Sequence, residues 1–592
     1  MIFLRRLWRT ITKPVYLPLV DKAEDTYLAL SKAGRGLFTF LSLVLIVSAV
    51  ALIYQLNSQL IVAIPGYGGG LTEGVVGSPR FINPILALSD ADRDLSILVY
   101  SGLLRATPEG SYTPDLAESY SVSPDGLVYT FIIRKNATFH DGAPVTAEDI
   151  LFTVNKTQDP ALKSPLRANW SGVAVETLDT HTVRFVLKSA YAPFIQNTTL
   201  GILPKHLWQE VTAEEFPFSD LNTSPVGSGP FRVFNISRTA SGIPSSYILH
   251  SFNKYALGEP YFSYLTLKFF QNESALAEAL SRGDVEAASG LSPETLLTIP
   301  KTHVLRAPLN RVFGVFFNQN QSEVLRDIDV RRALESSIDR EVLVLQVLRG
   351  YGTPLSGPIP PDVLSRRSSY ESAGAGQTAA TSSRASAAKE KLLTKGWVAG
   401  SEGVLVKKTG KGKDAKTITL SISLSTGNVP ELRAAAEYLR QEWTKVGAKV
   451  DVKIFDQGDL SQNVIRPRKY DALLFGEVVG REFDLFAFWH SSQRNDPGLN
   501  ISLYANATAD KILEQLRETS EDTKRQELFN KFEVELKKDV PAIFLYTPDF
   551  VYSIPQDIVS ATLGFIETPS DRFLSAPSWH RETDYVWPIF GR

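Results

Sequence analysis

An unbroken apolar run near the N-terminus dominates the hydrophobic pattern of the chain. Residues 37–56 read LFTFLSLVLIVSAVALIYQL and carry no charged side chain. As an α-helix, which rises about 1.5 Å per residue, this run would span about 30 Å, the thickness of the hydrocarbon core of a membrane. The pattern therefore predicts a transmembrane helix over 37–56.

Beyond this run, short stretches with the period of a strand are mixed with longer stretches that have the period of a helix. SPDGLVYTFII at 123–133 places an Asp-Gly turn before strand-forming residues and predicts a hairpin strand. The stretch 329–348 carries apolar residues near one face and predicts a helix capped by Asp329. Residues 428–455 predict a helix that ends at Gly447 and leads into a strand. This mixture indicates α/β construction.

The stretch IIRKNATFHDGAPVTAEDILFTVNK at 132–156 allows two interpretations. His140 beside Asp141, followed by Asp149, has the residue types of an acid–base cluster. The stretch also has the form of a strand, a turn and a helix, because Thr146 and Asp149 have the spacing of a capping box. We favour the second interpretation and expect a scaffold, since the sequence offers no nucleophile for a catalytic site.

Composition narrows the class of protein. The chain has 592 residues, of which 43% are hydrophobic and 21% charged, and this is the composition of a globular protein. Its length exceeds what one core usually fills, so two or three lobes are expected. The lack of cysteine excludes disulfides, thiolate metal sites, cysteine nucleophiles and a lipid-modified cysteine anchor. A formal net charge of -2 offers no basic footprint for nucleic acid.

The charges on either side of the apolar run predict its orientation. Residues 1–36 hold Lys and Arg in excess over acids, and no charge follows the run until Glu73. The positive-inside rule then places 1–36 in the cytoplasm and the large C-terminal part outside the cell membrane. Residues 57–70, which include IPGYGGG, are expected to be a flexible tether. A cleaved signal peptide, with Ala49 and Ala51 in an A-x-A pattern, is the alternative.

Eight segments carry a family resemblance through their motifs and through their order along the chain. They are YSGLLRATPEGSYTPDLAESYSVSPDGLVYTFIIRKNATFHDGAPVTAEDILFT (100–153), GSGPFRV (227–233), NKYALGEPYF (253–262), FNQNQSEVLRDIDVRRALESSIDREVL (317–343), GTPLSGPIPP (352–361), LRQEWTKVGAKVDV (439–452), YDALLFG (470–476) and DVPAIFLYTP (539–548). Together they resemble the large solute-binding proteins of peptide and nickel ABC importers, the extracytoplasmic family 5 type. The resemblance covers nearly all of 71–592. A single motif would be weak evidence for the family, whereas eight motifs in the family's order are specific evidence.

The resemblance implies an α/β, two-lobe periplasmic-binding-protein-like fold of the large, three-subdomain type. Lobe I would comprise 71–310, including a smaller subdomain, together with a C-terminal return over 541–592. Lobe II would comprise 311–540. The chain would cross between the lobes near 311–320 and 541–550, where apolar strand-like segments suit buried connections.

The resemblance also implies a function. It predicts a membrane-anchored, extracytoplasmic monomer that captures a solute by cleft closure and delivers it to the permease subunits of an ABC importer. Short peptides are the expected solute, and no cofactor, metal site or nucleic-acid partner is expected. Two alternatives stay open: a nickel or metal-chelate carrier of the same fold, and a sensor or chaperone without import. An enzyme is not expected, because the chain has no G-x-S-x-G, H-E-x-x-H or Walker motif.

The resemblance places an acid that holds a peptide amino terminus near Gly480, where this chain has glycine. Glu477, Glu482 and Asp484 are the nearest acids and the candidates for that role. Arg481 is the candidate partner of a solute carboxylate. A solvated loop charge is the alternative for each of them. Further candidate contacts, for which core packing or structural hydrogen bonding is the alternative, are Asn83, Tyr100, Asn318, Trp489 and His490.

Overall fold

The computed structural model describes residues 22, 26–299, 303–360, 381–410 and 416–586. These residues form two compact units. The first takes in the described residues up to Gly66 and from Glu582 onward, and the second runs from Tyr67 to Arg581. The boundary between the units therefore falls inside the expected tether.

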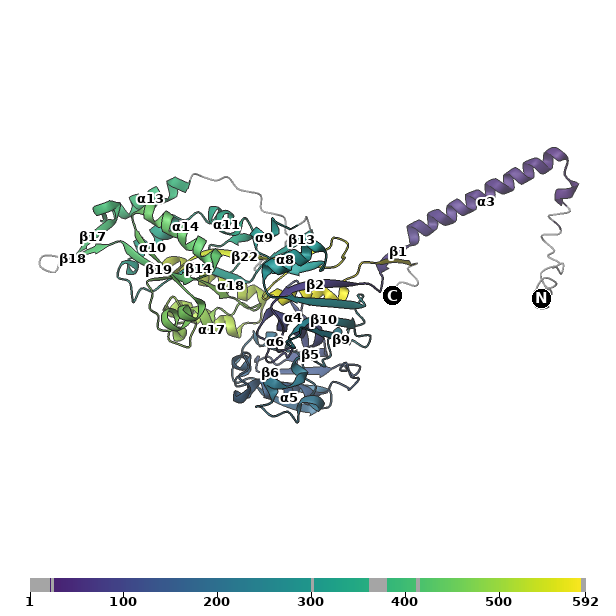
Figure 1. Cartoon of the computed structure of the whole chain (residues 1–592), viewed down its shortest axis with the longest axis horizontal. Helices are drawn as coiled ribbons and strands as arrows, with labels where there is room; N and C mark the ends of the chain where they lie inside the picture. The colour runs from purple at the N-terminus through teal and green to yellow at the C-terminus, as the bar shows by residue number, and fades with distance from the viewer. Residues whose placement is uncertain (1–21, 23–25, 300–302, 361–380, 411–415, 587–592) are drawn as a thin grey trace. The chain divides into compact units, whose positions relative to one another are not determined.

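A long helix, α3 (Lys32–Leu60), occupies the segment in which the transmembrane helix is predicted (Figure 1). The hydroxyl of Ser31 caps its start by accepting a hydrogen bond from Gly34 N at 3.2 Å. Among the described residues, Lys32–Gln55 is the one helical stretch long and apolar enough to cross a membrane. The helix extends beyond the predicted limits at both ends, while its insertion in a membrane stays a prediction.

The expected tether contains a strand. β1 (Val62–Pro65) pairs antiparallel with β23 (Thr583–Val586), and Gly66 N adds a hydrogen bond to Glu582 O at 2.8 Å. Val and Ile, which make up half of β1, are residue types that favour strands when a partner strand is present. The expected tether thus includes a short paired strand, and its limits, like those of the C-terminal return to lobe I, stay a prediction.

One sheet of twelve strands runs through the second unit. Its strands are β2 (Gly70–Val76), β9 (Phe231–Arg238), β10 (Pro244–Ser251), β11 (Tyr264–Phe270), β12 (Ala287–Ser289), β13 (His303–Pro308), β14 (Arg311–Phe317), β15 (Gly352–Pro354), β19 (Ser421–Gly427), β20 (Lys449–Phe455), β21 (Ala472–Val478) and β22 (Ala542–Ile554). The order is β20-β19-β21-β14-β22-β12-β2-β11-β10-β9, and β13 and β15 also pair with β22. One half of β22 pairs with β14 and β15 and the other half with β13 and β12, so this strand joins the two halves of the sheet.

Buried side chains divide the second unit into two lobes. Apolar residues between Leu71 and Leu309 and from Phe550 to Trp579 pack into one core, beside which residues from Leu276 to Leu291 form a small cluster of their own. Apolar residues from Val312 to Tyr546 pack into two further clusters. The first lobe is the part built on the first core, and the second lobe is the part built on the other two; the residue limits expected from the sequence stay a prediction.

The chain crosses between the lobes at two adjacent points. Leu309 and Asn310 connect β13 to β14, and Thr547 and Pro548 lie in the middle of β22. Leu309 N donates to Pro548 O at 2.8 Å, and Thr547 Oγ1 donates to Leu309 O. The two crossings are therefore hydrogen-bonded neighbours, which suits a hinge where a few residues absorb a change of backbone angle.

A small subdomain of the first lobe contains the stretch 132–156. The predicted capping box is confirmed, because Thr146 N donates to Asp149 Oδ2 at 2.9 Å. His140 is half-buried with Nε2 3.0 Å from Gly229 O, and desolvation of the ring lowers its pKa to about 4. The stretch is scaffold, as expected, with a neutral structural histidine. The subdomain consists of α5 (Ala147–Gln158) and the sheet β5 (Ala117–Val122), β6 (Val128–Ile133), β8 (Thr182–Val186) and β7 (Ala174–Asp179), in that strand order.

Helices pack against the strands of the second lobe. They include α10 (Ile328–Ser336), α11 (Arg340–Leu348), α13 (Thr381–Thr394), α14 (Pro430–Val446), α17 (Ala507–Glu518) and α18 (Asp522–Asp539) (Figure 1). The single helix predicted over 329–348 is two helices. Asp327 and Asp339 each begin one, because each side chain accepts from a backbone N–H of the turn that follows. The predicted helix end at Gly447 is confirmed, with a φ of 104°.

Candidate functional site

The crossing between the lobes brings two distant segments together. Asn310 Nδ2 donates to Gly480 O at 3.4 Å, in the loop 479–484 that follows β21. Asn310 N donates to Ile566 O at 2.8 Å, in the segment 565–571 that follows β22. The first segment belongs to the second lobe and the second segment to the first lobe, so side chains on them can meet between the lobes.

Arg481 extends from its loop into the first lobe. Its Nη2 donates to Asp571 Oδ2 at 2.7 Å and to Phe565 O at 3.2 Å, and its Nη1 donates to Thr107 O at 3.3 Å. Only 4% of the side chain is exposed. Groups of the protein therefore accept hydrogen bonds from most N–H groups of Arg481. The structure thus favours a role in joining the lobes over the predicted pairing with a solute carboxylate.

Arg481 also forms part of the wall of a cavity of about 180 Å³. The rest of the wall comes from the first lobe, where the cavity meets β3 (Leu104–Ala106), β4 (Tyr112–Pro114), α6 (Phe194–Asn197) and the 3₁₀ helix η10 (Pro569–Ser578). Tyr100, at the end of α4 (Asp90–Val99), lines it too. Two of the residues predicted to contact a solute, Tyr100 and Arg481, thus lie at one cavity.

Several polar atoms around this cavity are buried without a hydrogen-bond partner among the described residues. They are the hydroxyls of Tyr100 and Tyr112 and the Nε of Arg105. Native proteins pair nearly all buried polar groups, and leaving one unpaired costs about 1–3 kcal/mol. The concentration of such groups around one hollow indicates a place for a polar solute.

Buried carboxyl groups also line the cavity. The Tyr255 hydroxyl donates to Asp115 Oδ1 at 3.3 Å, and burial raises the pKa of Asp115 to about 6. Gln196 Nε2 donates to both carboxylate oxygens of Glu567, at 3.2 and 3.1 Å. Burial, with a smaller contribution from the charge of Asp571, raises the pKa of Glu567 to about 7. Near neutral pH the cavity thus contains an acid that is poised between its charged and neutral forms.

Gly480, where the family resemblance places an acid, lies beside Glu567. A Cβ on Gly480 would lie 3.3 Å from Gln196 Oε1 and 3.6 Å from Glu567 Oε1. A carboxyl group therefore stands close to the expected place, but it comes from the first lobe.

Arginines of the second lobe hold the acids predicted near Gly480. Arg517 donates to Asp484 through Nε at 2.9 Å and Nη2 at 2.6 Å, and the Tyr191 hydroxyl of the first lobe donates to the same carboxylate at 3.1 Å. Arg525 Nη2 lies 3.6 Å from Glu482 Oε2. Neither acid lines the cavity; Asp484 instead joins the two lobes at a second point.

Three other candidates belong to the interior of the second lobe. Trp489 is fully buried among aromatic rings, including those of Phe316 and Phe544. His490 stacks on Phe486 with ring centroids 4.0 Å apart. Glu477 is buried in β21, its Oε1 has no partner among the described residues, and burial raises its pKa well above the usual value. None of the three lines the cavity.

The two predicted asparagines have structural partners. Asn83 Nδ2 donates to Asn222 Oδ1 at 3.0 Å inside the first lobe. Asn318 Nδ2 donates to Arg468 O at 2.8 Å inside the second lobe. Both side chains are almost fully buried, and both order local loops.

Sequence reasoning missed most of the cavity wall, namely Arg105, Tyr112, Asp115, Gln196, Tyr255, Glu567 and Asp571. A local signal existed for one of them. TPSD at 568–571 has the spacing of a capping box, and Thr568 N donates to Asp571 Oδ2 at 3.2 Å. The same oxygen accepts the hydrogen bond from Arg481, so helix initiation fixes the acid that binds this arginine.

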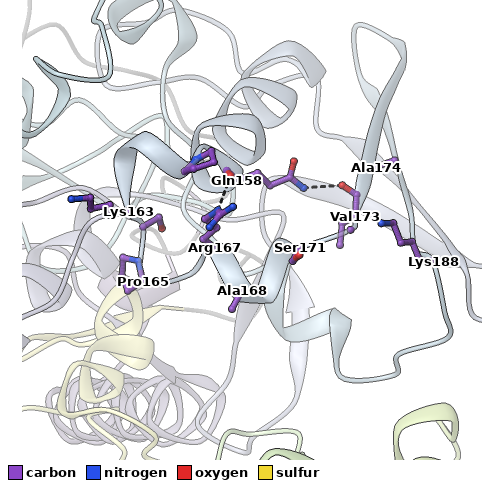
Figure 2. A pocket seen from close by; sticks show the side chains of 12 residues that line it. Gln158, Lys163, Pro165, Arg167, Ala168, Ser171, Val173, Ala174 and Lys188 are labelled. Atoms are coloured by element: carbon purple, nitrogen blue, oxygen red, sulfur yellow. Dashed lines mark hydrogen bonds between the residues drawn. The ribbon is translucent and has the colours of Figure 1, made fainter. Parts of the chain in front are cut away.

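A second hollow, of about 810 Å³, is formed by residues 158–188 of the small subdomain alone (Figure 2). Lys163, Arg167 and Lys188 give it positive charge, and Gln158 Nε2 orders one wall by donating to Val173 O at 2.8 Å. Because one subdomain provides the whole wall, movement of the lobes would not open or close this hollow. The cavity at Arg481 is therefore the better candidate for a solute site.

Comparisons with known proteins agree with the fold. The family model described as bacterial extracellular solute-binding proteins, family 5 Middle, matches residues 111–508. The oligopeptide-binding protein AppA of Bacillus subtilis is 27% identical over 510 residues, 83% of this chain and 89% of AppA. Its structure with a nonapeptide superposes with a TM-score of 0.64, covering 87% of this chain and 99% of that one at 25% identity.

A second solved structure gives the same result. The ABC transporter substrate-binding protein CtaP of Listeria monocytogenes superposes with a TM-score of 0.70, covering 87% of this chain and 100% of CtaP at 26% identity. The expected two-lobe periplasmic-binding-protein-like α/β fold is confirmed by these likenesses.

Proposed function

Because the chain belongs to family 5 of the bacterial extracellular solute-binding proteins, we propose that it captures a peptide between its lobes and delivers it to the permease of an ABC importer. The relative AppA, an oligopeptide-binding protein, supports the choice of a peptide. The observation that carries the proposal is the cavity at which the hydroxyls of Tyr100 and Tyr112 and the Nε of Arg105 have no hydrogen-bond partner among the described residues. Arg481 of the second lobe completes a wall that otherwise belongs to the first lobe, so a solute that contacts both favours the closed arrangement. The proposed role is binding, without a chemical reaction.

The size of the cavity bears on the length of the solute. At about 180 Å³ it is smaller than the roughly 300–1,000 Å³ of sites that hold drug-sized ligands. A neighbouring hollow of about 460 Å³ shares Arg105 and Tyr255 with it. We expect one end of a peptide to occupy the cavity and the rest of a longer peptide to extend into the neighbouring hollow.

Peptide binding is tested on the full-length protein, purified in detergent. We expect short alanine peptides to raise the melting temperature, since a ligand at 100 times its Kd stabilises the folded state by about 2.7 kcal/mol. Native mass spectrometry of the purified protein, followed by denaturation, should detect bound peptides of several different masses. A single metal-chelate mass, or no stabilisation by any peptide, would contradict the proposal.

A matched pair of variants locates the binding. Tyr112→Phe removes only a hydroxyl at the cavity and should weaken peptide binding by about tenfold, the effect of one lost hydrogen bond of about 1.4 kcal/mol. Tyr120→Phe, on an exposed side chain of the same lobe, should leave the affinity unchanged.

We further propose that α3 anchors the protein in the cell membrane with its N-terminus in the cytoplasm. The chain has no cysteine, so single cysteines introduced at Lys22 and at Asp220 report on topology without background. In intact cells, a membrane-impermeant maleimide should label Asp220→Cys and not Lys22→Cys. Labelled protein that is released in a soluble form without its N-terminal segment would identify a cleaved signal peptide instead.

A further inference from the structure

Outside the cavity, a short segment of the first lobe lies on an ion pair of the second lobe. The pair joins Arg517, in the last turn of α17, to Asp484, through Nε at 2.9 Å and Nη2 at 2.6 Å. The guanidinium also stacks on Phe486 of the same lobe, with Cζ 3.8 Å from the ring centroid. Contacts within the second lobe therefore hold this pair in place.

Two consecutive residues of the first lobe bind this pair. The Tyr191 hydroxyl donates to Asp484 Oδ2 at 3.1 Å, and Ala192 N donates to Arg517 O at 2.8 Å. The guanidinium of Arg517 lies 5.4 Å from the centroid of the Tyr191 ring. Tyr191, Ala192, Asp484 and Arg517 together form a latch between the lobes. Every group in the latch belongs to the chain, so its contacts do not depend on a solute.

Opening of the lobes would cost the latch only its contacts across the boundary. The pair of Asp484 and Arg517 would remain, while two hydrogen bonds and one cation–π contact would be lost. A hydrogen bond to a charged group is among the stronger ones, and only 19% of the Asp484 side chain is exposed to screening by water and salt. Burial, with the charge of Asp484, raises the pKa of Tyr191, so the hydroxyl retains the proton that it donates. The latch therefore favours the closed arrangement.

We propose that the latch keeps the lobes closed between binding events and thereby sets the rates at which solute enters and leaves the cavity. None of its four residues lines the cavity, so the latch acts through the position of the lobes. Solute enters and leaves only while the lobes are apart, so a preference for the closed form slows both steps. The latch stabilises the closed form equally with and without solute, so the affinity depends little on it while the closed form predominates. The part that concerns solute exchange rests on the proposed function.

The resting position of the lobes is tested on full-length protein in detergent, with no solute added. Because the chain has no cysteine, spin labels attach only at Asp220→Cys of the first lobe and Lys524→Cys of the second, both exposed positions. Pulsed electron paramagnetic resonance should give one predominant distance between the labels. Tyr191→Phe, which removes only the hydroxyl, should add a second distance and lower the ratio of closed to open protein by about tenfold, the effect of one hydrogen bond to a charged group.

Tyr247→Phe is the matched control. The Tyr247 hydroxyl donates to Thr223 O at 2.7 Å within the first lobe, so this variant loses one hydrogen bond but none between the lobes. Its distribution of distances should equal that of the original protein. Thermal unfolding of both variants checks that the lobes remain folded under the conditions of the measurement.

Solute exchange is tested by stopped-flow measurement of tryptophan fluorescence, with trialanine as the probe. In Tyr191→Phe the association and dissociation rate constants should both rise, by a similar factor of up to about tenfold, while Kd stays within about twofold. Tyr247→Phe should leave both rate constants unchanged. A purely structural role of Tyr191 would not raise the two rate constants together.

Two kinds of result would overturn the inference. Lobes that are mostly apart in the original protein, or an unchanged distribution of distances in Tyr191→Phe, would show that the latch does not hold them. A higher Kd with an unchanged association rate constant would show that the latch forms only after solute binds. If trialanine does not bind to the original protein, the proposed peptide function fails, and the distances still decide whether the lobes are latched.

Discussion

Replacing Arg572 by methionine is expected to lower the free energy of unfolding of the first lobe by about 3–5 kcal/mol, the usual effect of breaking a buried ion pair from one side. Arg572 is fully buried. Its Nε donates to Glu73 Oε1 at 2.7 Å, and its Nη1 and Nη2 donate to Asp94 at 2.8 and 2.6 Å. Methionine fills a similar volume but leaves two buried carboxylates without their cation.

The variant is measured by urea unfolding, followed by fluorescence and circular dichroism. Arg572→Lys should also be destabilised, because an ammonium cannot reproduce the two parallel hydrogen bonds to Asp94. Arg282→Met, at an exposed ion pair of the same lobe, serves as the control and should unfold like the original protein. An Arg572→Met protein with unchanged stability would show that the fold tolerates Glu73 and Asp94 without their cation.

This network also affects the cavity. Arg572 follows Asp571 directly in η10, and the ion pairs with Glu73 of β2 and Asp94 of α4 fix this helix against the first lobe. Glu567 and Asp571 flank the start of η10, so a loosened helix would misplace the acids of the cavity. Peptide affinity should therefore fall in Arg572→Met even at temperatures where the lobe remains folded.

Features that depend on neighbours in the chain were predictable from the sequence. The capping box of Thr146 and Asp149 and the helix end at Gly447 follow from short-range hydrogen bonds and from backbone conformation, and both are confirmed. The prediction of a single helix over 329–348 is wrong, and the reason is again a short-range hydrogen bond. The Asp339 side chain accepts a hydrogen bond from a backbone N–H of the following turn and so begins a new helix. The periodicity of apolar residues does not reveal this competition between capping and helix continuation.

The site was less predictable because its residues meet only in three dimensions. Proximity to Gly480 in the sequence selected Glu482 and Asp484, but arginines of the second lobe bind both of them. Glu567 lies far along the chain and reaches the cavity because Asn310 binds the backbone of Ile566 and of Gly480 together. The family motifs predicted the two-lobe fold. They could not predict the partner of each acid, because that depends on which arginine the fold brings near it.

The environment of Glu477 in the second lobe disfavours the charged form of its carboxyl group. Its side chain is almost fully buried in β21, and Oε1 has no hydrogen-bond partner among the described residues. Burial is the cause that raises its pKa. In the unfolded chain the same carboxyl group ionises near its ordinary pKa of 4.5.

Glu477→Gln is therefore expected to be more stable than the original protein at neutral pH. Above pH 4.5 the folded protein retains a proton that the unfolded chain has lost, so stability decreases as the pH rises, by about 1.4 kcal/mol per pH unit until the folded group ionises. Glutamine has no such proton and nearly the same shape. The advantage of the variant should thus grow from pH 5 to pH 7 and vanish below pH 4.

Urea unfolding of the second lobe at intervals between pH 4 and pH 8 measures this difference, and the other buried acids cancel because both proteins contain them. Glu437→Gln is a control of opposite sign. Hydrogen bonds from Arg440 hold the pKa of Glu437 at about 2, so this variant should be less stable than the original above pH 4.5, with the loss disappearing as the pH falls towards 2. If the curves of Glu477→Gln and the original protein run parallel across the whole range, Glu477 is ionised in the folded protein, and a charge partner has to exist beside β21.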